Sequence, residues 1–153
     1  MDVSKINSLV ELYFKKVEQI DKKKPFLQWL NPKNNHQYNW AEVTEKIYKF
    51  SYKIKSLIKE GDRVLLLSEN RPEWLIADLA IMNAGGITVP IFTTYAERDY
   101  EYILKDCSPS LIVVSNDAQF EKINKFIDNK EIISFEKIKT SSITFESIFN
   151  EKY

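Results

Sequence analysis

Glycine is scarce in this sequence, which has three glycines, Gly61, Gly85 and Gly86, among its 153 residues. Phosphate-binding loops of the dinucleotide-binding and P-loop types need several glycines at fixed spacing. Neither G-x-G-x-x-G nor G-x-x-x-x-G-K-[ST] occurs, so both types of loop are excluded. A single cysteine, Cys107, rules out an internal disulfide framework and suits a reducing compartment.

Net charge and long apolar runs are lacking too. The 22 basic and 22 acidic residues give a net charge of zero, which argues against non-specific electrostatic binding of nucleic acid. No apolar run approaches the ~20 residues of a membrane span, and the N-terminus lacks the layout of a secretory signal, so we expect a cytoplasmic protein. The run Lys22–Lys24 leaves open a peripheral contact with anionic lipid, although a solvated helix exit is the favoured interpretation.

The chain is rich enough in apolar residues, 44% with 13% aromatic, to build a core. Its centre, residues 60–95, predicts a strand, a helix and a second strand in a right-handed crossover. The helix is apolar on most faces and should lie inside the fold, with Trp74 as a core anchor. Gly85 and Gly86 should end this helix. Our structural core candidates are therefore Trp74, Gly85, Gly86 and Pro90, the last of which lies in the second strand.

The remaining segments follow the same alternation of helix and strand. Ser4 should cap a first helix and Asn39 a second, in a capping box with Glu42, and Gly61 should stop the second. The expected helices are residues 4–20, 40–57, 73–84, 97–106, 117–128 and a short turn at 144–149; the expected strands are 26–30, 36–38, 64–67, 87–92, 111–114 and 132–135. This pattern predicts an α/β fold with an open, mostly parallel, doubly wound sheet and helices on both faces, preceded by a helix and a short strand pair.

Few residues suggest chemistry. In doubly wound folds ligands bind at the carboxyl ends of strands, here the loops 68–71, 93–96 and 115–116 and those after residue 135. Arg71 could hold an anion there, but pairing with a carboxylate such as Glu73 is favoured. His36 lies in an Asn-rich turn without an orienting partner, so a catalytic role is not expected. We interpret Cys107 as a packing residue and not as a nucleophile. No cluster of residues in the sequence has the spacing of metal ligands.

One block carries a resemblance to a known family. The run Asn70-Arg71-Pro72-Glu73-Trp74, then Ala84-Gly85-Gly86, Val89-Pro90-Ile91 and Thr93-Thr94, resembles the first conserved block of the AMP-forming acyl-CoA synthetases, within the adenylate-forming (AMP-binding) superfamily. It is most similar to the long-chain fatty-acid–CoA ligase branch. The resemblance covers nearly all of residues 1–150 and is strongest from Gly61 to Val114.

The resemblance implies an activity for a longer protein. Such enzymes use ATP with magnesium to convert a fatty acid to an acyl-adenylate, release pyrophosphate, and pass the acyl group to coenzyme A. The family's ATP loop ending in Pro-Lys-Gly, its acyl pocket and its C-terminal domain have no counterpart in these residues. The resemblance therefore implies that residues 1–153 are an incomplete N-terminal portion of an AMP-binding domain, with helices and a strand pair at 1–60 and a βαβ core at 61–136. It supplies no catalytic, ATP-binding or metal residue here and no cofactor for this portion; its expected partner is the remainder of the enzyme.

Two other interpretations stay open. The chain could be a stand-alone, non-catalytic interaction module derived from such an enzyme, which would not expose a large apolar patch. A flavodoxin-like or response-regulator-like domain is less favoured, because it predicts an acidic cluster after the first strand of the sheet, where only Glu69 stands.

Overall fold

The computed structural model describes residues 5–30, 36–140 and 143–150. A five-stranded, fully parallel sheet forms its centre, in the order β4-β3-β5-β6-β7. Its strands are β3 (Arg63–Leu67), β4 (Ile87–Ile91), β5 (Leu111–Val114), β6 (Glu131–Ser134) and β7 (Ile143–Thr144). An antiparallel hairpin, β1 (Pro25–Trp29) with β2 (His36–Asn39), lies apart from it. The predicted α/β, doubly wound class is confirmed.

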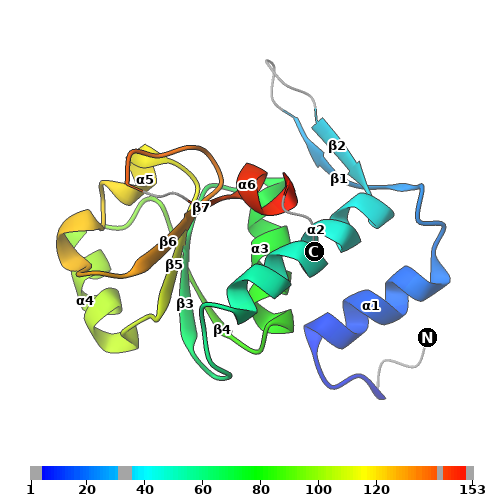
Figure 1. The fold of residues 1–153 in the computed structure, drawn as a ribbon, viewed down its shortest axis with the longest axis horizontal. Coiled ribbons are helices and arrows are strands. Elements are labelled where there is room, and N and C mark those ends of the chain that lie inside the picture. Colours follow the sequence, from blue (N-terminus) through cyan, green and yellow to red (C-terminus); the bar gives the residue numbers. More distant parts are fainter. Residues whose placement is uncertain (1–4, 31–35, 141–142, 151–153) are drawn as a thin grey trace.

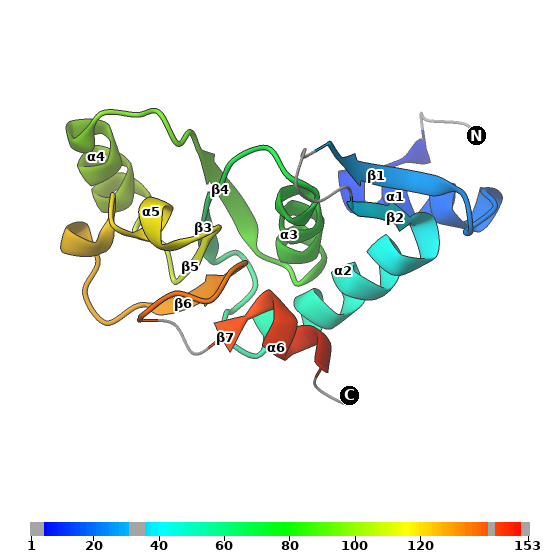
Figure 2. The same cartoon turned by 90° about the horizontal axis from the view of Figure 1, so that it is seen from above.

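Helices cover both faces of the sheet (Figure 1). On one side lie α2 (Trp40–Lys55), α3 (Pro72–Asn83) and α6 (Phe145–Asn150); on the other lie α4 (Glu97–Cys107) and the short α5 (Asp117–Phe120). Figure 2 shows α1 (Leu9–Gln19) and the hairpin beyond α3, farther from the sheet. In the described part of the chain, no helix has both the length and the apolar character needed to cross a bilayer.

Alternation along the strands divides the core in two. Val64 and Leu66 of β3 face α2 and α3, whereas Leu65 and Leu67 face α4 and α5. All four side chains are fully buried, as expected for a parallel strand covered on both faces. The α3 helix packs against α2 and also contacts α1, β1 and β4, so α1, the β1–β2 hairpin and α2 share one core with the sheet.

Local signals set several helix ends. Asn39 and Glu42 form the predicted capping box: the Glu42 N–H donates to Asn39 Oδ1 at 2.9 Å and the Asn39 N–H to Glu42 Oε2 at 2.8 Å. Gly85 follows α3 with φ 88°, the left-handed region that favours glycine. At Gly86 an added Cβ would lie 2.8 Å from Ile58 Cδ1, so the Ile58 side chain would have to shift to accommodate any larger residue.

Other boundaries differ from the predictions. The first helix starts at Leu9 and is capped by Ser8, whose Oγ accepts from the Glu11 N–H at 3.1 Å; the predicted cap, Ser4, lies outside the described residues. The second helix ends at Lys55, before Gly61. Gly61 instead takes φ 82° in the turn before β3 and donates its N–H to the Gly85 carbonyl at 2.8 Å.

The helix predicted for residues 117–128 is also wrong in extent. It ends at Phe120 and is followed by a short 3-10 turn, η2 (Asn124–Phe126). Backbone bonds of the i to i+3 type, such as Ile123 N–H to the Phe120 carbonyl at 3.0 Å, replace the helical ladder there. Lys122 Nζ donates to the Thr93 carbonyl at 2.7 Å, and this tertiary contact accompanies the tighter winding.

Two of the four core candidates need correction. Pro90 is exposed on β4, which among the described strands is an outer strand of the sheet and pairs only with β3. Proline is tolerated on such an edge because it lacks only the donor that would face outward. Trp74 is partly buried and packs at the border of the core instead of anchoring its centre. In the same core cluster, Phe50 of α2 is fully buried and contacts Phe145 edge to face.

Candidate functional site

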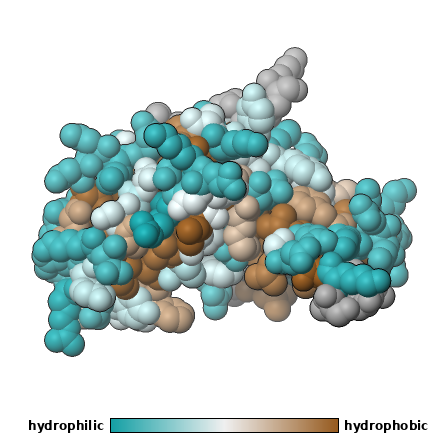
Figure 3. Space-filling model, turned by 90° about the horizontal axis from the view of Figure 1, so that it is seen from below, coloured by the Kyte–Doolittle hydropathy of each residue, from teal (hydrophilic) through white to brown (hydrophobic). Residues whose placement is uncertain are grey.

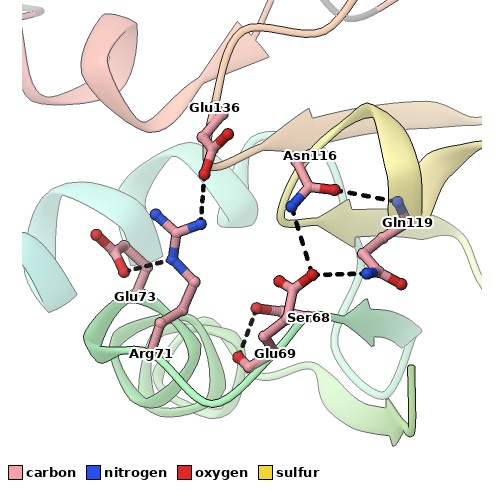
Figure 4. A network of polar contacts seen from close by, with 7 residues as sticks. All are labelled: Ser68, Glu69, Arg71, Glu73, Asn116, Gln119 and Glu136. Carbon is pink, nitrogen blue, oxygen red and sulfur yellow. Dashed lines mark hydrogen bonds and ion pairs between the residues drawn. The ribbon is translucent and has the colours of Figure 1, made fainter. Parts of the chain in front are cut away.

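The carboxyl ends of β3 and β5 form the candidate site. From β3 the chain crosses to β4 on one side of it, and from β4 it crosses back to β5 on the other side of β3. The strand order therefore reverses between β3 and β5. Ligands of doubly wound folds bind outside the strand ends at such a switch point. The loops that follow β3, β5 and β6 meet there (Figure 4). Three of the four regions singled out from the sequence are therefore brought together.

Glu69, just after β3, receives amide donors from the segment after β5. Gln119 Nε2 donates to Glu69 Oε1 at 2.6 Å, and Asn116 Nδ2 lies 3.4 Å from the same oxygen. Burial opposes ionisation of Glu69, but the hydrogen bonds that its carboxylate accepts, among them those from Gln119 and Asn116, outweigh burial and hold its pKa below the usual range. This carboxylate therefore stays ionised and ties the two loops together.

The fourth region joins the same network. Gln119 Oε1 accepts a hydrogen bond from Lys122 Nζ at 2.8 Å, and that ammonium also reaches the Thr93 carbonyl at 2.7 Å. The loop after β4 is thereby linked to the loops after β3 and β5. Each of these polar groups has an intramolecular partner, and the connected side chains fix the positions of the loops.

Arg71 closes the other half of the site. Its Nε donates to Glu73 Oε2 at 2.9 Å and one terminal nitrogen donates to Glu136 Oε1 at 2.7 Å (Figure 4). The guanidinium carbon lies 4.5 Å from the centre of the Trp29 ring, and the side chain is 9% exposed. Burial alone would lower the pKa of Arg71, but the bonds and charges of the two carboxylates raise it.

The Arg71 contacts have a structural consequence. The predicted ion pair with Glu73 is confirmed, and the partner from the loop after β6, Glu136, was not foreseen. Through Trp29 the same side chain ties the β1–β2 hairpin to the sheet. Because both carboxylates already engage the guanidinium, this arrangement positions segments and does not offer Arg71 to an external anion.

The two remaining candidates lie elsewhere. His36 is exposed on β2, with its ring edge-on to Tyr38 at a centroid distance of 4.3 Å. Cys107 is buried at the end of α4, and burial raises the pKa of its thiol, so the thiol stays protonated and acts as a packing residue as predicted. Within the residues that the structure describes, no group of three or more histidine, cysteine or acidic side chains could hold a metal ion.

Comparison with known proteins decides the family. The family described as "AMP-binding enzyme" matches residues 14–151. The chain belongs to the AMP-binding enzyme family. The predicted family resemblance is therefore confirmed, and with it the assignment of the block that starts at Gly61.

Curated relatives are long-chain ligases. A long-chain-fatty-acid–CoA ligase of Gallus gallus, ACSBG2, is 35% identical over 107 residues, which are 66% of this chain and 14% of that protein. FadD15 of Mycobacterium bovis, with the same enzyme name, is 33% identical over 79 residues, 51% of this chain and 13% of its own length. The chain thus spans about a seventh of the length of these relatives.

Two solved structures share the fold of this chain. A luciferase-like enzyme from the Zophobas morio mealworm has a TM-score of 0.81 at 19% identity, over 100% of this chain and 36% of that one. The anthranilate CoA ligase AuaEII, solved with anthranoyl-AMP, has a TM-score of 0.79 at 22% identity, over 97% of this chain and 29% of its own. At these identities the likeness establishes the fold alone.

Proposed function

We propose that residues 1–153 are the N-terminal part of a long-chain fatty-acid–CoA ligase. The whole enzyme would convert ATP, a fatty acid and CoA to acyl-CoA, AMP and pyrophosphate through an acyl-adenylate. The observation that carries this proposal is the 35% identity to a long-chain ligase across the block that resembles this branch. A cytoplasmic location, with peripheral contact to a membrane at most, belongs to the same proposal.

Within that enzyme, the part played by this chain is structural. The charged side chains of Glu69 and Arg71 at the strand ends are already paired within the chain: Glu69 with two amides and Arg71 with two carboxylates. Substrate-binding groups in an active site converge on an open cavity and leave some of their donors to the ligand. ATP, magnesium, fatty acid and CoA would therefore be bound by the remainder of the ligase, and the loops described here would hold the sheet in shape beneath it.

The proposal is tested by two assays run side by side. The complete polypeptide encoded by the reading frame of residues 1–153 should form palmitoyl-CoA from palmitate, ATP and CoA in the presence of magnesium. The isolated 153-residue chain should form none and should not bind ATP tightly in calorimetry. Acyl-CoA formation by the isolated chain would show that its own residues carry the chemistry.

The second candidate is a stand-alone interaction module. It would be soluble, would melt cooperatively and would bind little hydrophobic dye, because a finished domain covers its apolar surface. Exposed apolar residues on α1 and β4, Leu9 and Ile87, favour the first proposal. Dye binding and the melting curve of the isolated chain separate the two candidates.

A further inference from the structure

An apolar groove runs between α1 and α3, and we call it the α1–α3 groove. It encloses about 410 Å³, and its walls are formed by Leu9 and Leu12 of α1 and by Leu75, Leu79 and Met82 of α3. Small-molecule sites in proteins enclose about 300–1,000 Å³ and are mostly apolar, so the groove has the size and lining of a ligand site. Figure 3 shows apolar side chains at the surface in the half of the molecule that holds α1 and α3.

Three aromatic side chains complete the groove and fix its shape. Tyr13, Phe26 and Trp40 come from α1, β1 and α2. The Phe26 and Trp40 rings stack at a centroid distance of 3.8 Å, and the Tyr13 ring lies 5.9 and 5.8 Å from them. The Tyr13 hydroxyl already has a partner, Thr44 Oγ1 at 3.0 Å. An occupant of the groove would therefore contact mainly aliphatic and ring surfaces.

Two charged residues that line the groove have unpaired side chains. They are Lys16 and Asp78, and in the described part of the chain neither side chain takes part in a hydrogen bond or an ion pair. The neighbouring Lys15, in contrast, pairs with Glu11 at 2.6 Å. Lys16 is exposed, whereas Asp78 is partly buried. An apolar groove with an exposed, unpaired ammonium is complementary to a molecule that carries one alkyl chain and one anionic head group.

The order of residues along α1 places the ammonium at one end of the groove. Leu9, Leu12 and Lys16 follow one another at helical spacing on one face, so Lys16 lies about two turns, or about 10 Å, beyond Leu9. Asp78 lies within the α3 wall, three residues after Leu75. A carboxylate bound to Lys16 would leave its alkyl chain along both walls, and Asp78 would repel a carboxylate that entered more deeply.

We propose that the α1–α3 groove binds a long-chain fatty acid, with the carboxylate on the Lys16 ammonium and the alkyl chain between the two helices. Burial of the chain supplies the affinity, about fourfold per buried CH₂ group, and Lys16 supplies the orientation. The groove is separate from the strand-end loops that carry Glu69 and Gln119. The inference does not rest on the proposed function, because it follows from the size, apolar lining and charge of the groove.

An alkyl cation is the competing occupant, because Asp78 is also unpaired. It fits the groove less well. Asp78 is partly buried in the α3 wall, so a cationic head group would lose more of its hydration there than a carboxylate beside the exposed Lys16. The flexible stem of Lys16 also lets its ammonium follow a carboxylate at the boundary with water.

Photo-cross-linking to the complete polypeptide of this reading frame tests the inference. The probe is palmitic acid with a diazirine in the middle of its chain, used below its micelle concentration, and mass spectrometry maps the cross-linked residues. We expect cross-links in both α1 and α3, which palmitate displaces and which hexadecyltrimethylammonium at the same concentration does not. An absence of cross-links in these two helices would overturn the inference, and so would equal displacement by the two amphiphiles.

Two substitutions with opposite expected effects distinguish ligand binding from structural damage. Lys16→Gln should raise the half-saturating probe concentration for cross-linking in the groove by up to about fivefold, the factor that corresponds to an exposed ion pair. Asp78→Asn should lower this concentration, because it removes a repulsion. Lys15→Gln on the same helix is the matched control and should leave it unchanged. Weaker binding in both the Lys16 and the Asp78 variants, or no change in either, would contradict the assignment of a carboxylate to Lys16.

Palmitoyl-CoA formation, assayed on the same samples, separates this inference from the proposed function. A polypeptide that is cross-linked in the groove but forms no palmitoyl-CoA would retain the fatty-acid site and lose the ligase assignment. A polypeptide that forms palmitoyl-CoA but is cross-linked only outside α1 and α3 would retain the ligase assignment and lose the site.

Discussion

Gly86→Ala gives the sharpest test of the packing at the end of α3. The added Cβ would lie 2.8 Å from Ile58 Cδ1 and 3.1 Å from Ile81 Cγ2, so both side chains would have to shift to make room for it. Overpacking of this kind destabilises a protein by about 1–3 kcal/mol. Replacing glycine with alanine also lowers the conformational entropy of the unfolded chain, which stabilises the folded state by about 0.4–1 kcal/mol. We therefore expect a net destabilisation of about 1–2 kcal/mol in urea-induced unfolding.

A second substitution identifies the cause. Ile58→Val removes the Cδ1 atom that the new methyl group would meet, so the double variant should lose less free energy of unfolding than the sum of the single variants. The coupling should exceed about 0.5 kcal/mol. Relief should be partial, because the contact with Ile81 remains.

Gly61→Ala is the matched control. Gly61 has φ 82°, and a Cβ there would meet nothing within 4 Å, so its cost of about 1–2 kcal/mol comes from the left-handed backbone alone. Ile58→Val should add to it without coupling. A neutral Gly86→Ala, or equal coupling of Ile58→Val to both glycine variants, would refute the reasoning from close approach.

Three further perturbations test the core and the strand-end network. Arg71→Ala should lower the free energy of unfolding by up to about 3 kcal/mol in thermal melts. This is the lower end of the range for breaking a buried ion pair, because one of its two carboxylate partners is half exposed. Lys105→Ala breaks an exposed pair and should cost no more than about 1 kcal/mol in the same melts. Phe50→Ala should lower the free energy of unfolding by about 3–5 kcal/mol. Trp74→Ala should cost clearly less, because Phe50 is fully buried whereas Trp74 is only partly buried. Equal losses of stability in urea-induced unfolding would contradict this ranking. Glu69 has a lowered pKa in the folded state, so its contribution is complete above its unfolded pKa of about 4.3 and is lost as the pH falls through its folded value. The stability difference between wild type and Glu69→Gln should therefore shrink on acidification below about pH 4, and a difference that grows there would show that the pKa is not lowered.

Local signals made much of this fold predictable. The apolar run at β3 and the nearly uniformly apolar α3 identify a covered parallel strand and an interior helix. The Asn39 capping box is a signal of four residues, and the structure confirms it. Such features depend on neighbours in sequence, which the sequence displays directly.

Long-range features were not predictable in the same way. Pro90 stands in an apolar run, and only the strand order, set by distant pairings, makes β4 an edge. The bond between Glu69 and Gln119 joins residues 50 positions apart and depends on β3 lying beside β5. The helix predicted from Asp117 has suitable periodicity, but tertiary contacts at Lys122 and Ile123 override local propensity there.

The most direct test of the central claim is to sequence the transcript beyond the codon for Tyr153. If residues 1–153 are the N-terminal part of a ligase, the reading frame continues and, within some tens of codons, encodes a Ser/Thr/Gly-rich loop ending in Pro-Lys-Gly. A stop codon directly after Tyr153 would contradict the account, because the polypeptide would then lack the residues that the proposed reaction needs.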